Sequence, residues 1–145
     1  MNMSDMIGVL SAKGLKVTPQ RLAVLGALVA LPNHPTADSI KAYVNEQFPS
    51  LALGTVYNIL DVFFEKGIVT KVKTDRDFVR YDIEVNGHHH LYCDECDYIE
   101  NYFDEELDNL LQSYFQRKGI PNFNIRDINL QIVGSYINHN PPKNL

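Results

Sequence analysis

The segment TADSIKAYVNEQFPSLALGTVYNILDVFFEKGIV, residues 36–69, decides the fold. Apolar residues recur in its first half at three- and four-residue steps until Pro49, which predicts a helix opened by Thr36. A second helix is predicted from Leu53 to Gly67, where glycine is a natural left-handed cap. The short connection between them is typical of a helix-turn-helix, whose later helix enters the DNA major groove.

The flanking sequence extends this motif to a winged helix. Thr18 and Pro19 predict an N-cap and a first turn for an earlier helix that runs to about Leu31. Beyond the helix-turn-helix, two β-rich stretches, 68–72 and 78–83, flank a charged turn as in a hairpin. Three short helices followed by a hairpin outline a winged helix-turn-helix, and we assign the DNA-binding domain to residues 1–83.

The rest of the chain is predicted to form a small α/β dimerisation and metal-binding domain, residues 88–145, after a hinge at 84–87. Its expected elements are strands over 90–93 and 98–103, a helix over 104–118 and one long half-buried strand over 125–136. The overall fold class is therefore α+β. Because a unit of about 60 residues has little core of its own, a homodimer is expected.

Composition and charge restrict the function. With 145 residues and 45% hydrophobic content, the chain is neither disordered nor a large multidomain enzyme. Its net charge of −5 is unevenly divided: residues 1–80 carry 9 basic and 7 acidic side chains, and residues 81–145 carry 4 and 11. The first part can therefore face DNA, which would repel the second. No apolar run approaches the roughly 20 residues of a membrane span, and no export signal is evident, so we expect a cytoplasmic protein without a membrane partner.

A histidine run in the second domain has the pattern of a metal site. On a strand, His88 and His90 point to one side and can share an ion, whereas His89 faces away and is expected to be exposed or satisfied by other contacts. Asp82 at the end of the hairpin can add a carboxylate. Such mixed nitrogen and oxygen ligation suits iron(II), manganese(II) or zinc.

Two classes of enzyme are disfavoured. Cys93 and Cys96 form a C-x-x-C pair, which indicates metal or redox chemistry in a reducing compartment. A thiol oxidoreductase is disfavoured because no helix N-terminus is evident to stabilise a thiolate. A metallohydrolase at the histidine and aspartate cluster lacks an obvious general base and substrate pocket. We therefore expect no enzymatic activity.

Several motifs carry a resemblance to a known family. They are GLKVTPQR (14–21), NHPTAD (33–38), GTVYNIL (54–60), VRYD (79–82) and HHHLYCDEC (88–96). In their order and spacing the sequence resembles the Fur family of metal-dependent transcriptional repressors, and it is most like the peroxide-responsive PerR branch.

The resemblance implies one regulatory ion per subunit, iron(II) or manganese(II) with zinc as another occupant, which would tie the two domains together. Its implied ligands are His34, Asp82, His88, His90 and a fifth residue that aligns with Asn101. The PerR branch has an aspartate at that fifth place. Asparagine adds no charge, so either the site is weakened or the neighbouring Glu100 replaces it.

Two further implications concern sensing and the cysteines. With iron(II), the implied peroxide signal is oxidation of His34 or His88; the alternative is an iron- or zinc-responsive repressor without peroxide sensing. Many family members hold a structural zinc with two C-x-x-C pairs, but Tyr136 and His139 stand where the second pair would fall. A structural zinc at Cys93 and Cys96 is therefore not expected, although a Cys2His site completed by His139 remains an alternative.

For DNA contact, the resemblance implies residues before and within the predicted helix-turn-helix. They are Lys16, Arg21, Thr55, Tyr57 and Asn58. The last three lie near the start of the later helix, where side chains reach base edges or phosphates. A symmetric dimer implies double-stranded DNA with a palindromic operator.

Overall fold

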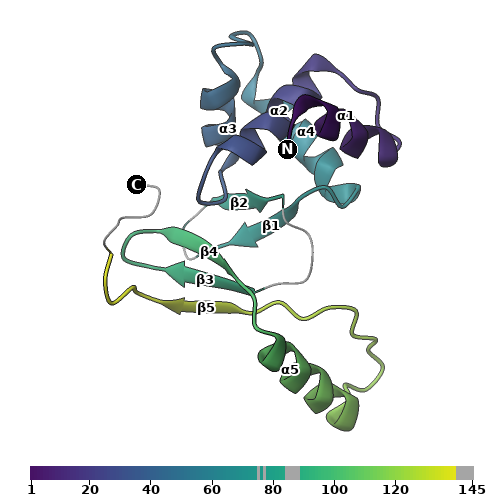
Figure 1. Ribbon diagram of the computed structural model, residues 1–145, viewed down its shortest axis with the longest axis vertical. Coiled ribbons are helices and arrows are strands. Elements are labelled where there is room, and N and C mark those ends of the chain that lie inside the picture. The colour runs from purple at the N-terminus through teal and green to yellow at the C-terminus, as the bar shows by residue number, and fades with distance from the viewer. Residues whose placement is uncertain (75, 77, 84–88, 140–145) are drawn as a thin grey trace. The chain divides into compact units, whose positions relative to one another are not determined.

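In a computed structural model of the chain, residues 1–74, 76, 78–83 and 89–139 are described. The chain forms two compact units, Met1–Val85 and Asn86–Leu145 (Figure 1). Helices and small sheets in both units confirm the predicted α+β class. The predicted hinge, 84–87, lies outside the described residues. Within the part of the chain that is described, no helix has the length and apolarity needed to cross a membrane.

The described residues of the first unit form four helices rather than the three that were predicted. They are α1 (Met3–Ala12), α2 (Pro19–Ala30), α3 (Ala37–Val44) and α4 (Leu53–Glu65). The unpredicted helix, α1, begins with a capping box between Asn2 and Asp5. It buries only Met6 and Leu10, so its apolar pattern in the sequence is weak.

The predicted extension of the α3 helix to Pro49 is wrong, because α3 ends at Val44. The backbone N–H groups of Gln47 and Phe48 both donate to the Val44 carbonyl and close a turn there. The intervening Asn45, Glu46 and Gln47 offer no apolar side chain to a helical face. The ends of α2 and α4 lie within two residues of their predicted positions.

The helices of the first unit enclose an apolar core and carry a hairpin. The core residues contributed by α2 and α4 include Val24, Leu25, Leu28, Val56, Leu60 and Phe63. The hairpin pairs β1 (Thr70–Lys73) with β2 (Val79–Asp82) in antiparallel register, with Thr70 opposite Asp82. Tyr81 of β2 is buried in the same core. This is the predicted winged-helix arrangement, and its wing is anchored by the core.

The described residues of the second unit form a three-stranded sheet and one helix. Its elements are β3 (His89–Cys93), β4 (Tyr98–Tyr102), α5 (Glu105–Lys118) and β5 (Gln131–Gly134). The strand order is β4-β3-β5, with β4 antiparallel and β5 parallel to β3 (Figure 1). Asp104 caps α5, because its carboxylate accepts a hydrogen bond from the Leu107 N–H.

The prediction of one long half-buried strand over 125–136 is wrong. Only Gln131–Gly134 form a strand, and all four residues are exposed. Alternating apolar residues specify a face, but a strand also needs a hydrogen-bonded neighbour, and β3 pairs with only these four positions. Since α5 also buries no residue, the second unit has a small core around Tyr92 and Ile99.

Candidate metal centre and nucleic-acid interface

The loop between α2 and α3 is joined to strand β2 by backbone contacts. Thr36 forms an antiparallel bridge with Arg80, and the Tyr81 N–H donates to the Pro35 carbonyl at 2.9 Å. These contacts fix the NHPTAD loop against the VRYD strand. Two motifs that are more than forty residues apart in sequence therefore meet within the first unit.

This junction brings together His34 and Asp82, which are two of the predicted metal ligands. His34 Nε2 lies 3.3 Å from Asp82 Oδ2, and the two side chains are 10% and 8% exposed. A neutral imidazole nitrogen and a carboxylate oxygen are both ligands of iron(II), manganese(II) and zinc. The pair fits an ion of this class, because both donor atoms can approach one position.

The backbone at His34 is strained and is held by a residue that the sequence analysis missed. Asn33 and His34 have φ angles of 63° and 55°, in the left-handed region that non-glycine residues rarely occupy. The buried Arg80 donates from Nη1 to the carbonyls of Asn33 and His34, at 2.9 and 3.3 Å. Arg80 thus positions His34, and its place in the VRYD motif two residues before Asp82 was the available signal.

In the second unit, the sheet register separates the two alternatives for the fifth ligand. His90 on β3 lies directly opposite Asn101 on β4, whereas Glu100 lies opposite Leu91. Directly opposite residues of an antiparallel pair share a face, and successive residues alternate. His90 and Asn101 are therefore on one face, and Glu100 is on the other. His88 lies outside the described residues.

His89 is buried and both of its ring nitrogens form hydrogen bonds. Of the two expectations for it, exposure or satisfaction by other contacts, the second is confirmed. It is 1% exposed, and its Nδ1 accepts a hydrogen bond from the Leu130 N–H at 2.9 Å. The ring proton must then reside on Nε2, which donates to Asp108 Oδ1 at 2.6 Å. His89 thus joins β3 to α5 and to the segment before β5.

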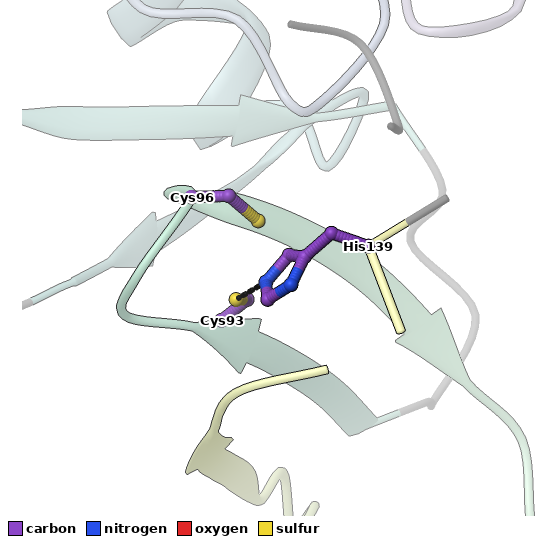
Figure 2. Close-up of side chains that lie close together, drawn as sticks. All are labelled: Cys93, Cys96 and His139. Carbon is purple, nitrogen blue, oxygen red and sulfur yellow. Dashed lines mark hydrogen bonds between the residues drawn. The ribbon is translucent and has the colours of Figure 1, made fainter. Parts of the chain in front are cut away.

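The C-x-x-C pair meets a third donor near the end of the described chain. Cys93 and Cys96 are free thiols, and Cys93 Sγ lies 3.3 Å from His139 Nε2 (Figure 2). Burial raises the pKa of Cys93, but hydrogen bonds from the backbones of Cys96 and Tyr136 and from the side chains of Cys96 and His139 outweigh burial and lower it to about 6. Burial and the hydrogen bond to Cys93 raise the pKa of Cys96.

Four of the five predicted DNA contacts are exposed in the first unit, and the fifth, Arg21, is half-buried. Thr55, Tyr57 and Asn58 are exposed on the first turns of α4, whose opposite face is buried in the core. Lys16 is exposed before α2, and Arg21 Nη1 donates to its carbonyl at 2.8 Å. Arg21 therefore holds the backbone from which Lys16 projects.

Comparison with known proteins gives a uniform picture. Residues 12–133 match the model of the Ferric uptake regulator family. A relative named peroxide-responsive repressor PerR, from Staphylococcus saprophyticus, is 33% identical over 132 residues, which cover 91% of this chain and 87% of the relative. The solved structure of a Campylobacter jejuni peroxide stress regulator is 26% identical with a TM-score of 0.70, covering 95% of this chain and 98% of that one. The ferric uptake regulator of Pseudomonas aeruginosa with manganese is similar in fold, with a TM-score of 0.75 at 24% identity over 92% and 98% of the two chains.

Proposed function

Because the chain belongs to the Ferric uptake regulator family, we propose that it is a metal-dependent DNA-binding repressor that senses peroxide. The observation that supports the proposal is the buried pair of His34 and Asp82 in the first unit, whose donor atoms lie 3.3 Å apart and would hold the metal ion. The moderate identity to repressors named for their peroxide response supports the sensing role. A repressor acts by binding, so no catalytic turnover is proposed.

The proposed ligands extend this pair with residues of the second unit. His88 and His90 follow from the sequence pattern, and Asn101 is preferred to Glu100 because it shares a face with His90. One ion per subunit, iron(II) or manganese(II), would then have ligands in both units. Any effect of the ion on DNA affinity must be matched by an equal effect of DNA on metal affinity.

DNA recognition is proposed for the exposed start of α4 and the segment before α2. Asn58 can pair bidentately with adenine in the major groove, and Thr55 and Tyr57 can reach base edges or phosphates. Lys16, with Arg21 holding its backbone, can reach the phosphate backbone. A homodimer would place two such surfaces on a palindromic operator, in the cytoplasm where the DNA lies.

The proposed signal is covalent damage to a ligand. Iron(II), if held by these ligands, would activate hydrogen peroxide next to them, and the two electrons that reduce the peroxide would come overall from one of the imidazole rings. One oxygen atom of hydrogen peroxide is added to the imidazole carbon of His34 or His88, the other leaves as water, and the ring is oxidised by two electrons overall. An oxidised imidazole is a weaker ligand, so the metal dissociates and DNA is released.

The first test measures manganese binding by variants of the proposed site, together with DNA binding by the manganese-loaded protein. Duplexes selected from a random pool with the manganese-loaded protein serve as the probe. Asp82→Asn and His34→Ala should weaken manganese binding by at least about tenfold, since even partners of metal ligands contribute about 10- to 100-fold. The matched control, Asp61→Asn, changes an exposed carboxylate of α4 and should bind manganese like the wild type. Equal manganese affinity of Asp82→Asn and the wild type would contradict the proposed site.

The second test separates peroxide sensing from simple metal sensing. Protein loaded with iron(II) or manganese(II) is treated with low peroxide, and duplex binding is followed together with the mass of the histidine-containing peptides. We expect one added oxygen on His34 or His88 only with iron, together with loss of duplex binding. Release of DNA without histidine oxidation would favour the iron- or zinc-responsive alternative.

A further inference from the structure

We propose that Cys93, Cys96 and His139 bind a second metal ion, a zinc ion in a Cys2His site, with the Glu95 carboxylate as fourth ligand. This site lies wholly within the second unit and does not depend on the proposed function. It also revises the expectation that no structural zinc binds here and takes up the alternative of a Cys2His site completed by His139, because the structure brings His139 to the thiol pair.

The local backbone places both sulfur atoms on the same turn. Cys93 ends β3 and Cys96 lies in the turn that leads to β4. Asp97 closes this turn with a left-handed φ of 62°, and its N–H donates to the Cys93 carbonyl at 2.8 Å. Tyr92 Oη donates to Asp97 Oδ1 at 2.7 Å and fixes the turn further. The C-x-x-C pair is thus held in a defined conformation before any ion binds.

Strand β5 delivers the third donor. Gly134 at the end of β5 pairs with Cys93 in parallel register, and its carbonyl accepts a hydrogen bond from the Asp94 N–H at 2.9 Å. Five residues later the His139 ring lies between the two sulfur-bearing side chains (Figure 2). The ring of Tyr136 meets the His139 ring edge to face, with centroids 5.9 Å apart, and so restricts its orientation.

The distances suit a tetrahedral zinc ion. One donor atom from each of the three residues lies within 4.8 Å of the others. With bonds of about 2.3 Å to sulfur and about 2.0 Å to nitrogen, tetrahedral ligands lie about 3.5 Å apart. Cys93 Sγ and His139 Nε2 are 3.3 Å apart, so little movement is needed. Glu95 Oε2 lies 3.8 Å from the same nitrogen and is the nearby carboxylate for the fourth position.

The donor chemistry favours zinc over the other ions considered for the first site. Two thiolates with one imidazole are soft and borderline ligands, which select zinc, whereas iron(II) and manganese(II) suit more oxygen-rich sets. Zinc would also tie the segment after β5 to the β3–β4 turn, which gives this small unit a cross-link that its core does not supply.

Cobalt(II) provides the test, because tetrahedral thiolate ligation gives it intense charge-transfer absorption. The background protein carries His34→Ala and Asp82→Asn, so that failure of this proposal and failure of the first site are distinguishable. It should bind one cobalt ion with a thiolate band, and zinc should displace the cobalt. His139→Ala should weaken zinc binding by more than about 100-fold, because a direct ligand contributes at least as much as its supporting partners do.

Further variants keep the test decisive if His139→Ala disturbs folding. His139→Cys should restore zinc binding and strengthen the cobalt thiolate band, since it adds a third sulfur. Asn138→Ala, the neighbouring control, should retain zinc binding. Unchanged zinc affinity in His139→Ala, or a Cys93–Cys96 disulfide that forms in the presence of equimolar zinc, would overturn the site. Unchanged affinity in Glu95→Gln would overturn the assignment of the fourth ligand.

Discussion

At the scale of single residues, the first unit positions His34 by opposing a strained backbone with a buried cation. Two consecutive non-glycine residues in the left-handed region cost free energy, which surrounding contacts must offset. Arg80 supplies those contacts by donating to both carbonyls of the strained pair. Its guanidinium is therefore a structural requirement for the geometry of His34 and Asp82.

We predict that Arg80→Met lowers the free energy of unfolding of the first unit by about 2 kcal/mol, because it removes charged hydrogen bonds to partly buried carbonyls. Manganese affinity should fall as well, since His34 loses its support. Urea unfolding and metal titration measure the two effects. Lys73→Met, which removes an exposed cation from β1 of the same hairpin, is the control. Equal stability of the two variants would contradict the role of Arg80.

The residues of the candidate sites were predictable where a local pattern specifies them. Spacing on a strand indicated that His89 turns away from His90, and the hydrogen bonds of His89 agree. The choice between Asn101 and Glu100 needed the register of β3 and β4. That register depends on how the two segments pair, and it cannot be deduced from the sequence of either segment alone. The approach of His139 to the thiols likewise depends on where β5 ends.

At the scale of elements, helix starts were predictable because capping is local. Thr18 accepts a hydrogen bond from the Arg21 N–H at 3.1 Å, and Pro19 begins α2 as its sequence predicts. Helix and strand ends depended more on tertiary partners. Thus α3 stopped before Pro49, and the segment 125–136 formed a strand only beside β3.

We predict that Thr18→Ala lowers the free energy of unfolding by about 1 kcal/mol, because the first turn of α2 loses its side-chain cap. Thr18→Ser keeps the hydroxyl and should lose much less. Urea denaturation followed by far-ultraviolet circular dichroism measures the difference. Equal losses in the alanine and serine variants would mean that the methyl group of Thr18, rather than its hydroxyl, stabilises the helix.

At the scale of the whole molecule, the two units differ in how completely they bury apolar side chains. The first has a core drawn from all four of its helices, and the winged-helix outline was predictable from their periodicity. In the second, Leu110 of α5 is 66% exposed and Val133 of β5 is 58% exposed. Apolar exposure of this kind on a small unit indicates a surface that a partner covers.

Strand β5 is the part of that surface that can pair with a second copy of the chain. Among the described strands it lies at the edge of the sheet, with one side paired to β3 and its residues Ile132 and Val133 exposed. An unprotected edge strand can pair with a second copy of itself across a two-fold axis.

We therefore predict that Val133→Lys shifts the protein from dimer to monomer, because it places a charge in the proposed contact. Sedimentation equilibrium over a range of protein concentrations measures the shift. Val29→Lys, which places the same charge on the exposed surface of α2, should remain dimeric. A Val133→Lys protein that stays dimeric at the lowest measurable concentration would require a dimer interface elsewhere on the chain.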